Sequence, residues 1–534
     1  MRRPRVELLR FISLGSILLI ALGLRAYRLG QLSFWYDEVV TMTLAREQGL
    51  RALLSKLDVI DATRAPLHPI LLHYWIQGFG PSEASGRAFS AICGVVTVAL
   101  VSRIARRAFN SPATGLLAAW LTALSPMLIV YSREARMYSW LVMLTCTAWE
   151  ALLSLGENPL TLNIAVNPEK CRRIPTRYVR LTWYFVCVVA LGYSHPLGIF
   201  MVATLALGSL LNARSAGFSA ASWLITHLLA ATFISAWIGH YIDHPPELIL
   251  GRLPIRFLFG TPIGWTGGNF LTLLPCLMVL CVGLFTWKRD PKNARYLRFT
   301  LVFERPLIDT LLLIWLTVPV AVLWVYSRVS YPLFGPARYT LYCSPPYLIL
   351  LARGMARLPR WAAGVLCLGA TAIAVSAYPT MIYAPDLKAD WRGAAASLGR
   401  SDPSRSEPVL VTTNDPRQNL EIVTARYYLG TVRKSIALPA PLSEVDSLRG
   451  TVPAPSRFWL AIGSHDGWLT AEIPWQIPLR RSAEILDVNG LRLIAIDPKD
   501  LPKLRLKSQG TAAPTPSAAP TPTPTGSPTN SGSG

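Results

Sequence analysis

Two adjacent carboxylates, Asp37 and Glu38, follow three aromatic residues in the segment SFWYDEVV, residues 33–40. A carboxylate can accept a proton from an attacking hydroxyl, and an aspartate with an ordinary pKa of about 3.9 is ionised and able to do so. A second role is open as well, because acidic residues in the first turn of a helix favour its dipole. The following sequence, TMTLAREQGLRALLSKL, has a helical pattern, so this capping role suits Glu38.

A second polar group lies in the segment SREARMY, which contains Arg133, Glu134, Arg136 and Tyr138. Glu134 and Tyr138 are four residues apart and the two arginines are three apart, so each pair shares one face of a helix. The alternative is a membrane junction with snorkelling side chains and local ion pairs. Arginines gather on the cytoplasmic side of membrane proteins, and the topology below places these two outside, which favours a functional role.

Three more polar residues fall at the ends of apolar runs. Arg338 and Tyr339 lie in YPLFGPARYTL, and His195 lies in GYSHPLG, where a histidine before proline is typical of a loop or cap. The segment HYIDH at residues 240–244 contains metal-capable side chains, but its spacing matches no standard metal site.

Arginine forks bind phosphate through two parallel hydrogen bonds. A lipid phosphate would bring its head group to the depth of these helix ends. Together with a nearby carboxylate, this chemistry predicts the transfer of a group from a lipid phosphate to an acceptor. Sugar transfer fits well, because an oxocarbenium-like transition state is stabilised by a nearby negative charge.

The composition sets the surroundings of these residues. The chain has 534 residues, of which 52% are hydrophobic and 15% are charged, whereas soluble proteins contain about 25% charged residues. The net charge of +22 comes from clusters between apolar runs, which is typical of cytoplasmic loops and argues against nucleic-acid binding. The eight cysteines form neither a disulfide framework nor a zinc-type spacing.

The apolar runs predict a polytopic α-helical membrane protein, because a spanning helix needs about 20 mostly apolar residues. We expect eleven spans, near residues 8–28, 85–105, 113–131, 136–156, 181–194, 197–212, 219–240, 267–287, 307–326, 338–352 and 361–382. A cleaved signal peptide is the alternative for the first run, and we favour an uncleaved span. The run at 66–80 is too short to span, and we expect an interfacial amphipathic helix there.

With the run at 66–80 excluded as a span, every basic segment falls on one side of the membrane. We therefore expect a multi-pass protein of the plasma (inner) membrane, with a cytoplasmic N-terminus and an extracytoplasmic C-terminal part. The domains are then residues 1–382, which include an outer loop at 29–84, a small α/β domain at 383–500 and a disordered Pro/Thr/Ser-rich tail at 501–534. The sequence AEILDVNGLRLIAI predicts a β-hairpin with an Asn-Gly turn.

The segments around Asp37, the run at 66–109 and the segment SPMLIVYSREARMYSWLVML resemble the GT-C membrane glycosyltransferases. Their family-39-like branch, which includes protein O-mannosyltransferases and aminoarabinose transferases, is the most similar group. The resemblance covers residues 8–210 well, and ARY at 337–339 and KADWRGAAASL more loosely.

This resemblance implies a polyprenyl-phosphate-sugar donor and inverting transfer of a hexosyl or pentosyl group on the outer face, to a lipid, glycan or protein acceptor. It implies that Asp37 is the catalytic carboxylate and Glu134 the second acid, with Arg136 and Tyr138 as its neighbours. We expect seven residues to bind substrate: Glu38, Arg133, Arg136, Tyr138, Arg338, Tyr339 and His195. No metal ligand is predicted, and because relatives differ in metal dependence, a divalent metal cofactor stays open.

Two other classes compete with this interpretation. A transporter or flippase of lipid-linked saccharides would place polar groups and broken helices near the membrane midplane, commonly in inverted repeats. Here the polar groups cluster at the outer ends, and no symmetry relates the two halves. A membrane-anchored sensor or scaffold would use residues 383–500 for binding and would not need Asp37 or the outer arginines.

Overall fold

The computed structural model describes residues 2–61, 65–155, 161–165, 171–213, 219–243, 255–266, 270–290, 293–301, 305–329, 337–379, 389–404, 406–412, 420–430, 435–438, 457–463, 475–476, 484–488, 491–496 and 505–506. The chain divides into two compact units, Met1–Asp390 and Trp391–Gly534, and each is described by itself. The predicted boundary near 383 thus falls a few residues before the observed division.

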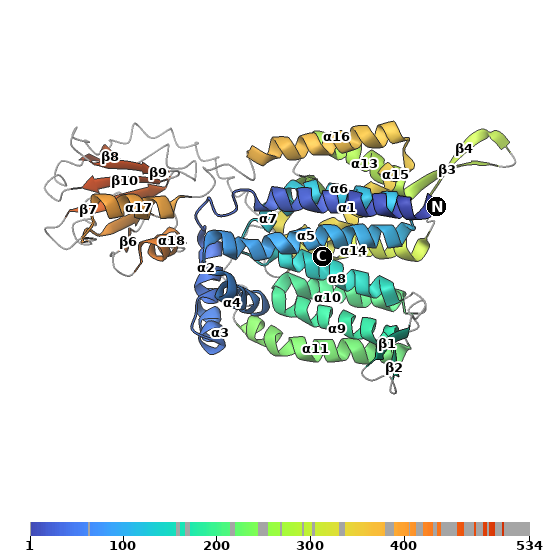
Figure 1. Cartoon of the computed structure of the whole chain (residues 1–534), viewed down its shortest axis with the longest axis horizontal. Coiled ribbons are helices and arrows are strands. Elements are labelled where there is room, and N and C mark those ends of the chain that lie inside the picture. Colours follow the sequence, from blue (N-terminus) through green and yellow to red (C-terminus); the bar gives the residue numbers. More distant parts are fainter. Residues whose placement is uncertain are drawn as a thin grey trace, which may run out of the picture. The chain divides into compact units, whose positions relative to one another are not determined.

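The first unit is a bundle of long helices that run side by side (Figure 1). Its helices are α1 (Arg2–Ala26), α5 (Glu83–Phe109), α6 (Pro112–Leu124), α7 (Pro126–Ser132), α8 (Tyr138–Leu155), α9 (Thr176–Ser194), α10 (Pro196–Leu211), α11 (Ala220–Asp243), α12 (Arg256–Thr266), α13 (Phe270–Leu284), α14 (Pro306–Val329), the 3-10 helix η1 (Ala337–Cys343), α15 (Ser344–Arg357) and α16 (Arg360–Ala377). Every one of the eleven predicted spans overlaps at least one of these helices.

Six of the described helices are long and apolar enough to cross a membrane, or seven if the bent pair α6 and α7 forms one span. Residues 196–211 and 274–284 form shorter apolar helices. The structure thus supports a multi-pass helical membrane protein, and the number eleven stays a prediction. Two hairpins, β1 (Thr161–Ala165) with β2 (Cys171–Pro175) and β3 (Phe285–Asp290) with β4 (Asn293–Leu301), lie within the predicted basic loops.

Three short helices cover the end of the bundle that lies opposite the N-terminus and the two hairpins (Figure 1). They are α2 (Tyr36–Ala45), α3 (Leu50–Ile60) and α4 (Leu67–Phe79), and we call this end of the bundle the α2 end. Helices α2 and α3 pack through Val40, Leu44, Leu53 and Leu57. Helix α4 has 13 residues, which give a length of about 20 Å, too short to cross a bilayer core of about 30 Å.

The helix over residues 113–131 is broken, since α6 and α7 meet at an angle of 60°. The break leaves carbonyl groups of α6 without helical partners, and membrane proteins tolerate this only where the protein supplies donors. Arg25 of α1 is fully buried here and donates from Nη1 to the Ala123 carbonyl at 3.2 Å and from Nε to Ser132 Oγ at 3.2 Å. The buried guanidinium of Arg25 therefore supplies hydrogen bonds to both α6 and α7 at the break.

The core of the bundle centres on two stacked indoles. The rings of Trp149 and Trp315 lie 5.1 Å apart and almost parallel. The indole nitrogen of Trp315 donates to the Tyr342 carbonyl at 3.0 Å. Gly208 leaves the room for Trp149, because a Cβ at that position would lie 2.8 Å from the ring. These contacts join α8, α10, α14 and η1 inside the bundle.

The second unit contains a five-stranded sheet with the order β6-β5-β7-β10-β9. Its strands are β5 (Val409–Thr412), β6 (Ser435–Leu438), β7 (Phe458–Gly463), β9 (Ile485–Val488) and β10 (Leu491–Ile496), and its helices are α17 (Trp391–Ser401) and α18 (Leu420–Leu429). Strand β5 is parallel to β6 and β7, and β10 is antiparallel to β7 and β9. The predicted hairpin is confirmed, because β9 and β10 pair on either side of residues 489–490.

Part of the predicted tail is structured. Arg505 and Leu506 form strand β11, which pairs with β8 (Trp475–Gln476), so the prediction of disorder from residue 501 was wrong at its start. The sequence LRL alternates apolar and charged residues, which is a strand pattern that the composition of the following residues concealed. Residues 507–534 lie outside the described part of the chain.

The first prediction concerns the contact between α13 and α15. Because Gly354 has no side chain, the backbones of the two helices approach each other closely there. A Cβ at Gly354 would lie 2.0 Å from the Val279 carbonyl oxygen, whereas a Cβ at Gly364 would meet nothing within 4 Å. We expect Gly354→Ala to destabilise the bundle by about 1–3 kcal/mol through overpacking, and Gly364→Ala to have no such effect. Thermal unfolding of both purified variants in detergent measures the difference, and equal midpoints would contradict the close packing.

Candidate active site at the α2 end

The α2 end is built around a buried ion pair between Glu38 and Arg87. Neither side chain is exposed by more than 3%. Arg87 Nε donates to Glu38 Oε1 at 2.7 Å and Nη2 donates to Oε2 at 2.8 Å, a two-pronged contact. Glu38 also accepts from the backbone N–H groups of Ala135 at 2.9 Å and Trp35 at 3.3 Å.

All the hydrogen-bond donors of Arg87 are used within the protein. Its remaining N–H groups reach three carbonyl oxygens of the first loop, those of Leu29, Leu32 and Ser33, at 2.7–3.0 Å. Five donors therefore meet five acceptors, which offsets the cost of burying the charge. The geometry favours the capping alternative for Glu38 over substrate binding, because its side chain is fully buried and both carboxylate oxygens accept hydrogen bonds from the protein.

Asp37 is the other acid of the pair, and its side chain has a different environment. Consecutive residues of a helix point about 100° apart, so the inward direction of Glu38 turns Asp37 towards the edge of α2. The Asp37 side chain is 23% exposed, and its Oδ2 lies 4.0 Å from Nη1 of Arg338. Asp37 is therefore an accessible carboxylate beside a cation.

Arg338 lies in the first turn of the short helix η1 and is partly exposed. Its Nη2 donates to the Tyr339 hydroxyl at 3.1 Å, and its guanidinium lies 4.9 Å from the Tyr339 ring centre. Its side chain is 24% exposed. The structure thus brings the predicted residues Arg338 and Tyr339 next to Asp37, although about 300 residues separate them in the sequence.

Arg136 supports Asp37 from the protein side. Its Nη1 donates to the backbone carbonyl of Asp37 at 3.1 Å and to Thr41 Oγ1 at 2.8 Å. Burial alone would lower the pKa of Arg136, but the carboxylates of Asp37 and Asp61 raise it above its ordinary value. The buried guanidinium therefore stays charged and holds the first turn of α2.

Glu134 and Tyr138 lie around Arg136, and both side chains are buried. The charge of Glu134 contributes to the raised pKa of Arg136, which places the two side chains near each other. The Tyr138 ring packs against Tyr131 at 5.2 Å and His195 at 6.1 Å. These contacts assemble the predicted group from three separate segments.

His195 caps α10. Its Nδ1 accepts from the Leu197 backbone N–H at 3.0 Å, so the neutral ring carries its proton on Nε2. Burial, together with the positive charges of Arg136 and Arg338, lowers the pKa of His195 to about 3. The ring is therefore neutral at physiological pH and is a hydrogen-bond donor beside Tyr138.

Arg133 lies away from this group. Its Nη1 donates to carbonyl oxygens near the C-terminus of α1, including those of Arg25 at 2.9 Å and Tyr27 at 2.7 Å. A cation at this position also complements the helix dipole. Nη1 of Arg133 therefore holds the end of α1, and the substrate contact expected from the sequence stays a prediction.

Sequence reasoning missed Arg87, Thr41, Asp61 and His68. Arg87 carried a usable signal, because an arginine at the outer end of an apolar helix is as unusual as Arg133 or Arg136. Asp61 and His68 are buried beside Arg136, where both line a small cavity. Their sequence context gives no sign of burial, since each belongs to a short helical segment of the first loop.

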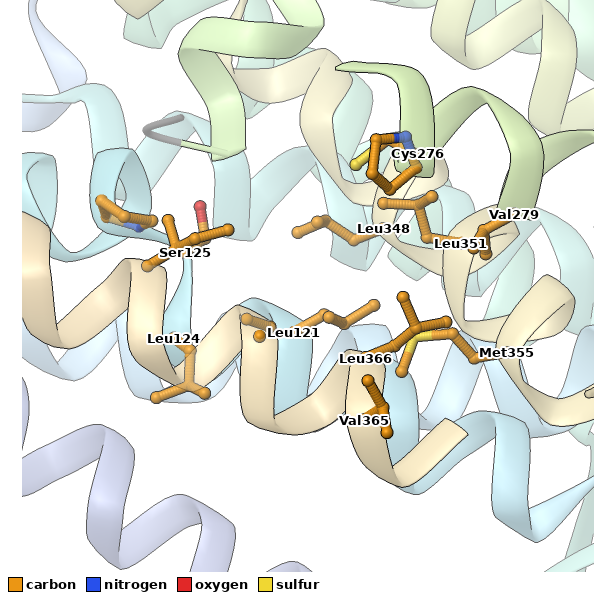
Figure 2. Close-up of a pocket in the computed structure, with 15 residues that line it drawn as sticks. Leu121, Leu124, Ser125, Cys276, Val279, Leu348, Leu351, Met355, Val365 and Leu366 are labelled. Carbon is orange, nitrogen blue, oxygen red and sulfur yellow. The ribbon is translucent and has the colours of Figure 1, made fainter. Parts of the chain in front are cut away.

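A separate apolar cavity of about 360 Å³ lies within the bundle. Figure 2 shows it between α6, α13, α15 and α16, with Leu121, Leu124, Cys276, Val279, Leu348, Leu351, Met355, Val365 and Leu366 around it. Ser125 and Pro126, at the break between α6 and α7, also line it. The volume is in the range of small-molecule sites, about 300–1,000 Å³.

The donor set for a metal is sparse. Among the described residues, no group of three or more His, Cys, Asp or Glu side chains could hold a metal ion. The segment HYIDH ends at His244, which lies outside the described residues.

Comparisons with known proteins agree with this architecture. Residues 63–160 match the family of dolichyl-phosphate-mannose-protein mannosyltransferases. The structure of ArnT from Cupriavidus metallidurans in the apo state aligns with a TM-score of 0.52 at 14% identity, over 93% of this chain and 98% of that one. A second ArnT structure, bound to undecaprenyl phosphate, aligns with a TM-score of 0.50 at 14% identity, over 90% and 97% of the two chains. No curated protein sequence matches the chain significantly.

These matches support the resemblance to GT-C membrane glycosyltransferases that the motifs indicate. The alignment extends over nearly the whole of both chains. At 14% identity this similarity establishes the fold alone, so the roles of individual residues depend on the geometry of this chain.

The second prediction contrasts the two adjacent acids. Glu38→Gln leaves Arg87 buried without its carboxylate, and breaking such a pair costs about 3–5 kcal/mol. Asp37→Asn removes a partly exposed charge, which is worth less than about 1 kcal/mol. We expect Glu38→Gln to lower the thermal unfolding midpoint strongly and Asp37→Asn to leave it nearly unchanged. Similar midpoints for both variants would show that the Glu38–Arg87 pair does not hold the α2 end together.

Proposed function

We propose that this chain is an inverting membrane glycosyltransferase that moves a sugar from a polyprenyl-phosphate carrier to a hydroxyl acceptor on the outer face of a plasma membrane. The observation that carries the proposal is the distance of 4.0 Å between the accessible Asp37 carboxylate and the Arg338 guanidinium. The shared fold of an ArnT structure bound to undecaprenyl phosphate supports a polyprenyl-phosphate carrier.

Asp37 is the catalytic carboxylate in this proposal. The acceptor oxygen attacks C1 of the sugar, and Asp37 takes the proton of the acceptor hydroxyl. The bond between C1 and the phosphate oxygen breaks, and its electrons leave with the lipid phosphate. This single displacement inverts the configuration at C1. Arg338 stabilises the charge that develops on the departing phosphate, because part of its guanidinium is exposed beside Asp37.

The neighbouring residues have supporting roles. Arg136 holds the backbone of Asp37, and Glu134 is the second acid near it. The rings of Tyr138 and Tyr339 form walls of the sugar site, and the neutral His195 offers its Nε2 hydrogen to a sugar hydroxyl. Glu38 and Arg133 position helices.

The apolar cavity between α6, α13, α15 and α16 suits part of the isoprenoid chain of the carrier. Its lining is almost entirely aliphatic, and one end reaches Ser125 and Pro126 (Figure 2). From that point α7 leads directly to Arg133–Tyr138, so the cavity and the polar group are joined by one short helix. The acceptor and the sugar, whether hexose or pentose, are left open by this geometry.

The third prediction tests the reaction. Purified full-length protein should transfer label from at least one member of a panel of polyprenyl-phosphate hexoses and pentoses to envelope lipid, glycan or protein acceptors. We expect Asp37→Asn to lower the rate about 10²- to 10⁴-fold, the usual contribution of a positioned acid or base. Asp58→Asn, the same change at an exposed acid of α3, should retain full activity.

Two outcomes would contradict this proposal. Full activity of Asp37→Asn would remove Asp37 from the mechanism. Movement of lipid-linked saccharide across vesicles without any transfer would favour the flippase alternative.

The fourth prediction tests the orientation, because the proposed site must face the outer side. In a Cys281→Ser background, a cysteine at the exposed position Val59 should react with a membrane-impermeant maleimide on intact cells. A cysteine at Asn110, exposed at the opposite end of α5, should react only after the membrane is permeabilised. The reverse pattern would place Asp37 in the cytoplasm and contradict the proposal.

A further inference from the structure

A small cavity lies beside Arg136 at the α2 end. It has a volume of about 10 Å³, close to the lower limit for one water molecule. Its lining consists of Thr41, Asp61, Ala65, His68, Pro69, Arg136, Met137 and Ser194. These residues come from α2, α4, the end of α3, the segment before α8 and the end of α9, so the cavity lies where the elements of the site converge.

Two buried polar atoms of this lining have no hydrogen-bond partner among the described residues. They are Nε2 of His68 and Nε of Arg136. The residues themselves are 2% and 6% exposed. Leaving a buried polar atom unsatisfied is costly, and buried water is the usual partner of such groups in proteins. Each of two residues that line this cavity thus carries a buried polar atom without a partner among the described residues, and the cavity has about the volume of one water.

The protonation of His68 is compatible with such a water. Burial, together with the positive charge of Arg136, lowers the pKa of His68 to about 3, so the ring is neutral at physiological pH. A neutral imidazole can accept a hydrogen bond on Nε2 when its proton is on Nδ1. Arg136 Nε can only donate, so a water between the two atoms satisfies both.

We infer that one water bridges Arg136 Nε to His68 Nε2, and that His68 is a positioning residue that holds the Arg136 guanidinium and through it Asp37. The water accepts from Arg136 and donates one hydrogen to His68, and its other hydrogen is directed to the acidic side of the lining, where Asp61 lies. Arg136 can then keep Nη1 on the Asp37 carbonyl and on Thr41 Oγ1. The role of His68 in transfer rests on the proposed function, whereas the water does not.

Two substitutions separate the hydrogen bond of His68 from its packing. His68→Phe keeps a ring against Phe89, whose centre lies 5.8 Å away, but removes the acceptor atom. His68→Gln keeps a hydrogen-bond acceptor, the side-chain oxygen, at a similar distance from the backbone, but it removes the ring. His73→Phe is the matched control on the same helix, because His73 bonds the Ala45 carbonyl and Gln77 and does not line the cavity.

The fifth prediction concerns these variants, assayed as full-length protein with the lipid-phosphate sugar that the wild type uses. We expect His68→Phe to lower kcat about ten- to a hundredfold, as small misplacements of catalytic groups do, with an unchanged KM for the donor. His68→Gln should restore kcat to near the wild-type value. His73→Phe should lower the thermal midpoint but not the kcat of the folded enzyme.

A merely structural His68 would give a different pattern, in which His68→Phe and His68→Gln lose stability and activity together. That pattern, or a wild-type kcat in His68→Phe, would overturn the positioning role. High-resolution cryo-electron microscopy of the full chain tests the water without any substrate, and density between His68 Nε2 and Arg136 Nε is expected. An empty cavity would overturn the inference even in an active enzyme, whereas density in a chain that transfers no sugar would contradict only the proposed function.

Discussion

The arrangement of the α2 end depends on the buried ion pair between Glu38 and Arg87. A buried carboxylate or guanidinium is tolerated only when its partner and its remaining hydrogen bonds are supplied, and here the protein supplies all of them. The pair joins α2 to α5, and the Ala135 N–H ties the segment before α8 to the same carboxylate. Three segments that are distant in the sequence are thus fixed at one point. The direction of the Asp37 side chain follows from this constraint, because Asp37 directly precedes Glu38 in the same helical turn.

The arginines at the α2 end fall into two sets. Arg25, Arg87 and Arg133 donate to carbonyls and hydroxyls that the fold would otherwise leave unsatisfied, at the break of α6, in the first loop and at the end of α1. Arg136 and Arg338 keep donors that the described residues do not use. The second set therefore has donors that can serve a substrate or a bound water. A cluster of arginines at one end of a bundle can therefore contain residues that stabilise the fold and residues with donors left for a ligand. The hydrogen-bond partners of each donor distinguish the two kinds.

Local patterns explain how much of this was predictable from sequence. The helical segments, the short helix α4 and the β9–β10 hairpin follow from runs of apolar residues, their length and turn chemistry, all of which act between near neighbours. The group around Asp37 was also predicted in large part, because Arg136, Tyr138 and Arg338 stand at helix ends. The capping role of Glu38 was predicted, but its ion pair was not, because its partner is an arginine 49 residues away. The contacts of Arg133 with the end of α1 depend on a distant segment in the same way. His68 and Asp61 become notable only once tertiary packing buries them.

The order of the two acids is itself a physical requirement. The longer side chain stands at position 38, where the carboxylate must reach across to α5 and accept from Arg87, Ala135 and Trp35 together. The shorter side chain stands at position 37, where the carboxylate stays close to its own backbone. Arg136 donates a hydrogen bond to the carbonyl of that backbone. In the proposed reaction, a short side chain with a fixed carbonyl loses little freedom when a substrate orders it. Exchanging the two acids would place the longer side chain at position 37, where the carboxylate stays close to its own backbone. It would place the shorter side chain at position 38, where the carboxylate must reach Arg87. The order Asp-Glu is therefore not equivalent to Glu-Asp at this helix start.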